Sequence, residues 1–170
     1  AKLAHSIGLT PNQISVIGII FATLSALAYW KWQLFHPFLL IAAPLLLLAS
    51  GFCDALDGTL ARLYEKTTTF GGFLDSLLDR YADAVIFCGI ILGGLCDVFW
   101  GLAALICSLL VSYARARAEA TGVKMETVGI AERAERLGIL AIASCLSIAW
   151  LEALSWGVVV RAILTNLTVL

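Results

Sequence analysis

Residues 37–62, PFLLIAAPLLLLASGFCDALDGTLAR, decide how this chain folds. The run 37–50 contains no ionisable side chain, and Asp54, Asp57 and Arg62 come after it. A helix needs about 20 mostly apolar residues to cross a bilayer. This stretch therefore predicts a transmembrane helix whose polar end lies near one membrane face.

The rest of the chain has the same apolar character. Its 170 residues are 61% hydrophobic and 14% charged, whereas a soluble domain has about 45–50% apolar residues and about a quarter charged. We therefore predict an all-α, polytopic membrane protein of about six transmembrane helices, which forms a single domain over residues 1–170. Residues 1–9 could form an interfacial segment. The expected spans are 13–34, 37–62, 70–95, 97–120, 133–151 and 153–170.

The first span has a clear start signal. Thr10-Pro11-Asn12-Gln13 offers a threonine N-cap, proline at the first helical position and glutamine three residues after the cap. This is a capping-box pattern. It explains these residues without a ligand, although Asn12 could instead contact a substrate.

Lysine and arginine gather in residues 62–66 and 115–136. The connections at the opposite ends of the predicted spans contain only one such residue, Lys31. Because short loops rich in Lys and Arg face the cytoplasm, we predict an integral protein of the cell membrane with both termini and the active site on the cytoplasmic side. Arg161 fits this scheme less well, since it lies inside the last apolar stretch. The net charge of −1 identifies no partner, and no nucleic-acid partner is expected.

Acidic side chains form two stripes. Residues 54, 57, 58 and 61 follow the i, i+3, i+4, i+7 spacing of one helix face, and Gly71, Asp75 and Asp79 are spaced by four. Because the connection 63–69 is short, we expect the two helices to be antiparallel neighbours. Four carboxylates, Asp54, Asp57, Asp75 and Asp79, would then converge.

Four acids at membrane depth need a counter-charge, since each costs about 2.5–3.5 kcal/mol to insert. Two divalent cations balance them most simply. An all-oxygen ligand set favours Mg²⁺ or Mn²⁺ over Zn²⁺, and a two-metal site suits displacement at phosphorus. The ion or proton site of a transporter is the alternative. Gly58, Ala61 and Gly71 either leave room for a ligand or let helices pack closely.

The pattern D-x-x-D-G-x-x-A-R-x8-G-x3-D-x3-D over residues 54–79 resembles the signature of the CDP-alcohol phosphotransferase family, without a departure. The resemblance implies transfer of a substituted phosphate from a CDP-linked lipid donor (CDP-diacylglycerol or CDP-archaeol) to a small polar alcohol, with release of CMP. It also implies a homodimer. By position, Asp54, Asp57 and Asp75 resemble metal ligands, and Asp79 resembles a ligand that is also the general base. The positions that resemble the nucleotide site are Asp57, Gly58, Ala61, Arg62, Gly71 and Asp75.

Two further stretches, SYARARAE at 112–119 and ERAERL at 132–137, resemble the branch that uses inositol phosphate as acceptor. Arg115 stands where that branch has lysine. The resemblance implies that Arg115, Arg133 and Arg136 bind the acceptor phosphate. Lipid head groups and topology alone also explain basic residues at these helix ends, so glycerol phosphate, serine or another polyol stay open as acceptors.

Two charged residues keep open roles at this stage. Asp83 continues the stripe of Asp75 and Asp79 by one turn, and either supports the metal site or pairs helices. Arg161 lines the cavity, pairs with an acid or marks a shorter last span.

Overall fold

The computed structural model describes residues 8–122 and 133–169, without the side chains of residues 133, 134, 136, 168 and 169. In these ranges the chain forms six α-helices and one short 3-10 helix, and no strand. The elements are α2 (Pro11–Trp30), η1 (Trp32–Phe35), α3 (Phe38–Leu63), α4 (Thr69–Leu92), α5 (Val98–Ala120), α6 (Arg133–Leu146) and α7 (Glu152–Val169). The prediction of an all-α protein of about six helices is confirmed.

Side-chain caps set several helix starts. At α2 the predicted capping box is present, because Gln13 N donates to Thr10 Oγ1 at 3.4 Å and Thr10 N donates to Gln13 Oε1 at 2.9 Å. Thr68 caps α4 by accepting from Gly71 N at 2.9 Å. Asp97 caps α5 through the N–H groups of its first turn. These caps satisfy N–H groups that have no partner within the helix.

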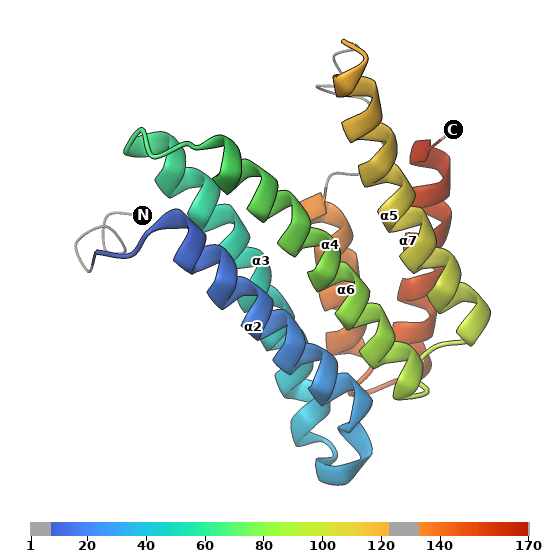
Figure 1. Cartoon of the computed structure of the whole chain (residues 1–170). Helices are drawn as coiled ribbons and strands as arrows, with labels where there is room; N and C mark the ends of the chain where they lie inside the picture. The colour runs from blue at the N-terminus through green and yellow to red at the C-terminus, as the bar shows by residue number, and fades with distance from the viewer. Residues whose placement is uncertain (1–7, 123–132, 170) are drawn as a thin grey trace.

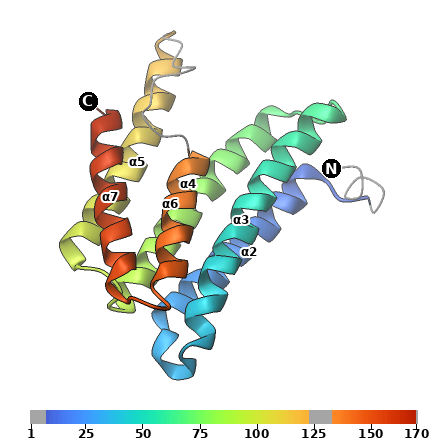
Figure 2. The same cartoon turned by 180° about the vertical axis from the view of Figure 1, so that it is seen from behind.

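The helices alternate in direction, so that the start of α2, the connection between α3 and α4, the end of α5 and the end of α7 lie at one end of the molecule (Figures 1 and 2). α2 packs along both α3 and α4, α6 packs on α3 and α7, and α5 packs on α7 and α4. A Cβ on Gly89 would lie 2.3 Å from the Ala26 carbonyl oxygen, so α2 and α4 meet at small residues.

The expectation that the two acidic helices are direct packing neighbours is only partly met. α3 and α4 run in opposite directions across a short connection, but these two helices, both described throughout, do not pack extensively against each other. α2 bridges them instead. The physical reason is the composition of the two faces that α3 and α4 turn toward each other. These faces carry acids and small residues, which line cavities and do not form an apolar helix–helix contact.

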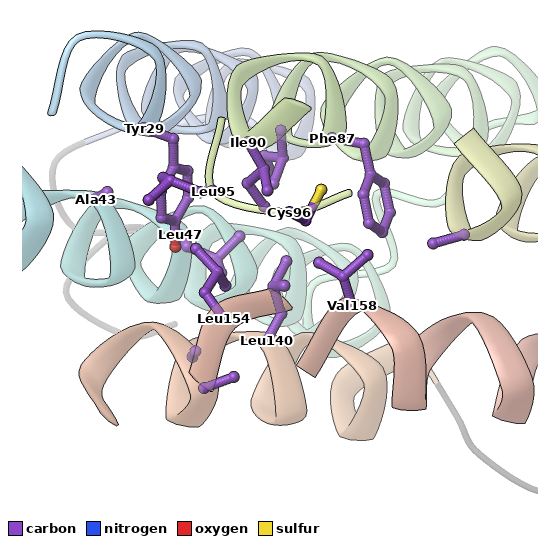
Figure 3. Close-up of a cluster of buried hydrophobic side chains, with 14 of the residues drawn as sticks. Tyr29, Ala43, Leu47, Phe87, Ile90, Leu95, Cys96, Leu140, Leu154 and Val158 are labelled. Atoms are coloured by element: carbon purple, nitrogen blue, oxygen red, sulfur yellow. The ribbon is translucent and has the colours of Figure 1, made fainter. Parts of the chain in front are cut away.

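The apolar core lies between α2, α3 and α4 on one side and α6 and α7 on the other (Figure 3). Phe87 of α4 and Leu47 of α3 meet Leu140 and Val158 there. Tyr29 enters the same core and forms a hydrogen bond of 2.6 Å between its Oη and Ser144 Oγ, which links α2 to α6.

The outer surface is apolar, as a lipid-facing surface should be. Phe38 is 77% exposed and Phe52 is 67% exposed. Among the described residues, α2, α3 and α5 are long and apolar enough to cross a membrane by length and composition. α4 carries three aspartates, the described α6 has 14 residues, and α7 contains Arg161. The chain is an integral membrane protein.

Candidate active site

Two adjoining pockets open between α2, α3 and α4. The acid pocket, of about 260 Å³ including open solvent, is lined by Asp54, Asp57, Asp75 and Asp79 together with Ser15 and small or apolar residues. The outer pocket, of about 600 Å³ measured in the same way, extends from the acid pocket toward the starts of α2 and α4. Ser15, Asp57 and Asp75 line both pockets and form their common wall.

Three of the four predicted metal ligands form a close group. Carboxylate oxygens of Asp54, Asp57 and Asp75 all lie within 4.8 Å of one another. Asp57 is only 4% exposed, so its charge has little access to bulk water. Three carboxylates at this spacing repel one another unless a cation lies between them, and an all-oxygen set fits a hard divalent ion. The residues present therefore fit a magnesium or manganese site.

Asp79 lines the acid pocket but lies outside this close group. Its Oδ2 is 3.6 Å from Arg80 Nη1, and the same nitrogen donates to the Ser76 carbonyl oxygen at 2.6 Å. The structure thus places the fourth aspartate in the same cavity as the other three, with an arginine beside it.

Ser15 of α2 is a site residue that sequence reasoning missed. Its hydroxyl forms a hydrogen bond with Asp57 Oδ2 and approaches the Pro11 carbonyl oxygen at 3.2 Å. An ionised carboxylate only accepts hydrogen bonds, so the Ser15 hydroxyl is the donor to Asp57. No spacing rule could have found this pair, because the two residues are 42 positions apart.

All six predicted nucleotide positions line the outer pocket: Asp57, Gly58, Ala61, Arg62, Gly71 and Asp75. A Cβ on Gly58 would meet nothing closer than Arg62 Nη2, at 3.7 Å. Gly58 therefore faces the pocket and not another helix, which favours room for a ligand over close helix packing at this position. Sequence reasoning missed Lys66, Thr67, Thr68 and Gly72 in the same lining.

The outer pocket is positive at its rim. The N-termini of α2 and α4 border it through Pro11 and Gly71, and Arg62 and Lys66 line it. Helix N-termini carry about half a positive charge. Asn12 lines the pocket too, so its position in the capping segment is compatible with the ligand contact that the sequence left open.

The grouping of Arg115, Arg133 and Arg136 around an acceptor phosphate stays a prediction, because only Arg115 has a described side chain. Arg115 is exposed on the last turns of α5 and is absent from the described lining of both pockets. The Arg133 and Arg136 side chains lie outside the described part of the chain.

The open roles of Asp83 and Arg161 are resolved as a pair. Arg161 Nη2 lies 3.2 Å from Asp83 Oδ1, and Ser108 forms a hydrogen bond with the other oxygen, Asp83 Oδ2. Asp83 is therefore a helix-pairing residue, and Arg161 is a buried cation that pairs with an acid.

Known proteins share this fold and this arrangement of helices. The chain is 44% identical to archaetidylinositol phosphate synthase of Pyrococcus horikoshii, over 98% of this chain and 83% of that protein. A crystal structure of Mycobacterium tuberculosis phosphatidylinositol phosphate synthase with CDP-DAG bound superposes with a TM-score of 0.82 at 30% identity, over 99% of this chain and 86% of that one. The same enzyme in complex with manganese and citrate gives a TM-score of 0.83 at 30% identity, over 99% and 82%.

The sequence profile of one family covers the described fold almost completely. It matches residues 8–170, from just before the α2 cap to the end of the chain. This range includes the acidic motif of α3 and α4, both pockets and the helices that support them. The chain therefore belongs to the CDP-alcohol phosphatidyltransferase family.

Proposed function

We propose that this protein transfers a substituted phosphate from a CDP-linked lipid to inositol phosphate and releases CMP. One observation carries the proposal: Asp57 and Asp75 form the wall between a close group of carboxylates and an outer pocket with a positive rim. A diphosphate in the outer pocket would lie beside the carboxylate group, where displacement at phosphorus can be assisted by metal ions.

The outer pocket suits the diphosphate of the donor. Two helix N-termini and the side chains of Arg62 and Lys66 all favour phosphate oxygens. Gly58 leaves the α3 backbone accessible at the same wall. We assign nucleotide binding to Asp57, Gly58, Ala61, Arg62, Gly71 and Asp75.

Asp54, Asp57 and Asp75 would hold divalent cations, with Asp79 as a further ligand, and we assign two Mg²⁺ or Mn²⁺ ions to this set. When bound, these ions neutralise phosphate charge and stabilise the oxygens at the reacting phosphorus. Ser15 holds the Asp57 carboxylate in the orientation that faces the group.

We assign the role of general base to Asp79. The acceptor hydroxyl oxygen forms a bond to the phosphorus that carries the lipid, the bond from this phosphorus to the CMP oxygen breaks, and the hydroxyl proton passes to Asp79. CMP leaves with the electron pair of the broken bond. Asp79 lines the acid pocket outside the close carboxylate group, which supports a role beyond metal binding.

Inositol phosphate is the acceptor that the relatives favour, because the archaeal and mycobacterial proteins above are named for inositol phosphate products. The archaeal relative also favours an archaeol-based donor. We assign binding of the acceptor phosphate to Arg115, Arg133 and Arg136, and substitution of Arg133 or Arg136 by alanine should raise acceptor KM more than donor KM.

We further propose a single domain over residues 1–170 that works as a homodimer, with both termini and the active site on the cytoplasmic side. Arg62 and Lys66 line the outer pocket near the end of α3, and Arg115 belongs to the last turns of α5, whereas Lys31 follows the end of α2. The ends of α3 and α5 lie at one end of the molecule and the end of α2 at the other (Figure 1). This distribution follows the positive-inside rule.

The test is CMP release by the purified protein with Mg²⁺, CDP-archaeol or CDP-diacylglycerol, and each candidate acceptor in parallel. Release with inositol phosphate supports the proposal, and release only with another alcohol overturns the acceptor. Asp57→Asn should abolish release. Asp97→Asn is the matched control, because that aspartate caps α5 outside both pockets and asparagine caps equally well. Ion flux into liposomes that needs no CDP-linked substrate would contradict the transferase function and favour a transporter.

A further inference from the structure

Arg161 is the largest fully buried side chain among the described residues, at 1% exposure. It belongs to α7, which packs on α5 and α6 and, in the described ranges, not extensively on α4. Its guanidinium nevertheless crosses to α4. Nη2 lies 3.2 Å from Asp83 Oδ1, and Cζ lies 4.7 Å from the centre of the Phe87 ring. Asp83 and Phe87 are four residues apart, so Arg161 contacts α4 at two successive turns of one face.

The same carboxylate also joins a third helix. Asp83 Oδ2 accepts a hydrogen bond from Ser108 of α5, while Oδ1 faces Arg161. The Thr165 hydroxyl donates to the Arg161 carbonyl oxygen at 2.6 Å within α7. A single side chain of α4 is therefore held from α5 and α7 at once, and both of its oxygens are engaged away from the acid pocket.

We propose that Arg161 is a positioning residue for the transfer reaction, which sets the rotation and depth of α4 and thereby the place of Asp79. The inference rests on the proposed function, in which Asp79 takes the acceptor proton. Asp75, Asp79 and Asp83 are spaced by four along one stripe of α4. Fixing Asp83 and Phe87 therefore fixes the preceding turn, which carries Asp79 into the acid pocket.

A role in stability alone does not explain this arrangement. A buried ion pair is weak evidence for stability, because desolvation of the two charges offsets their attraction. The Arg161 Nε atom is buried without a hydrogen-bond partner in the described part of the chain. The guanidinium thus contacts Asp83 and Phe87 of α4, while its Nε–H donor stays without a hydrogen bond among the described residues. Placement of α4 accounts for that geometry, since an error of about 1 Å in a reacting group can reduce a rate by about 100-fold.

The decisive experiment compares the wild type with a neutral pair, Asp83→Asn combined with Arg161→Gln. Two amides can still form a hydrogen bond across the helices, and loss of both charges removes the desolvation cost, so this variant should stay folded. We expect a kcat for CMP release that is about 10- to 100-fold lower, with donor and acceptor KM within about twofold of wild type. Thermal stability, measured by calorimetry, should be close to wild type.

Two further variants separate positioning from general packing. Arg161→Lys keeps the charge but lacks the planar group that stacks on Phe87, so it should recover part of kcat. Tyr29→Phe removes another buried interhelical hydrogen bond, to Ser144, and should lower stability while kcat per folded molecule is unchanged.

Wild-type kcat in the neutral pair would overturn the proposal. The proposal would also be overturned if the loss of kcat, in the neutral pair or in Arg161→Lys, were fully explained by a smaller amount of folded protein. A selective rise in acceptor KM would show that Arg161 binds substrate instead. Failure of the proposed function is distinguishable from all of these, because the wild-type protein itself would then release no CMP.

Discussion

Substitution of Ser15 by alanine tests the metal site through a residue that only the fold reveals. The Ser15 hydroxyl donates to Asp57, whose side chain belongs to the close carboxylate group and is almost fully buried. A hydrogen bond to a charged group contributes about 1.5–3 kcal/mol. At about 1.4 kcal/mol per factor of ten, this corresponds to a change of about 10- to 150-fold in an equilibrium constant. Because Ser15 orients only one of the two Asp57 oxygens, we expect the lower end, about a 10-fold weaker apparent Mg²⁺ affinity.

The assay is the rate of CMP release at saturating donor and acceptor, measured as a function of free Mg²⁺. Ser15→Ala should shift the half-saturating Mg²⁺ concentration upward, whereas Ser15→Thr keeps the hydroxyl and should stay near wild type. Thr23→Ala is the matched control in the same helix, since that hydroxyl donates to the Ile19 carbonyl oxygen at 2.8 Å. It should leave the Mg²⁺ dependence unchanged.

An unchanged Mg²⁺ dependence in Ser15→Ala would refute the reasoning, because Asp57 would then be oriented without its partner on α2. An equal shift in the Thr23→Ala control would do the same, since it would assign the effect to α2 as a whole.

Three other predictions concern the neighbouring elements. Gly58→Val should raise donor KM by about 10-fold, equivalent to about 1.4 kcal/mol of binding, at undiminished thermal stability, because Gly58 lines the outer pocket and an added Cβ has Arg62 Nη2, at 3.7 Å, as its nearest neighbour; unchanged donor KM would remove Gly58 from the nucleotide site. Gly89→Val should destabilise the protein by about 1–3 kcal/mol through overpacking, since even a Cβ would lie 2.3 Å from the Ala26 carbonyl oxygen; a denaturation midpoint equal to wild type would contradict this contact. Chelation by EDTA should stop CMP release and added Mg²⁺ or Mn²⁺ should restore it, whereas release that survives chelation would exclude the carboxylate group as a required metal site.

Most of the fold was predictable from local chemistry. Apolar runs of span length and the capping box at Thr10 both act over neighbouring residues, and the observed helices follow them within a few positions, apart from the earlier end of α6 at Leu146. The spacing of the acidic motif placed Asp54 and Asp57 on one helix face for the same reason. The resemblance to a known family then supplied roles that spacing alone does not contain.

Contacts between distant segments were not predictable in this way. The sequence of α2 contains no pattern that predicts the hydrogen bond between Ser15 and Asp57. It also does not predict that α3 packs mainly on α2 and not on α4. Arg161 had three open roles until α7 was seen to reach Asp83. Each of these contacts depends on how whole helices are rotated and offset against one another.

The sequence by itself determined that this is a helical membrane protein with an acidic motif across two connected helices, because hydrophobic length and helical periodicity are properties of contiguous residues. Only the tertiary structure decided that three carboxylates form a close group while Asp79 stands apart from it, and that a buried arginine holds α4 at Asp83, one turn beyond Asp79. The reason is physical. Distances between side chains on different helices are set by the packing of all six described helices together, and no single segment encodes them.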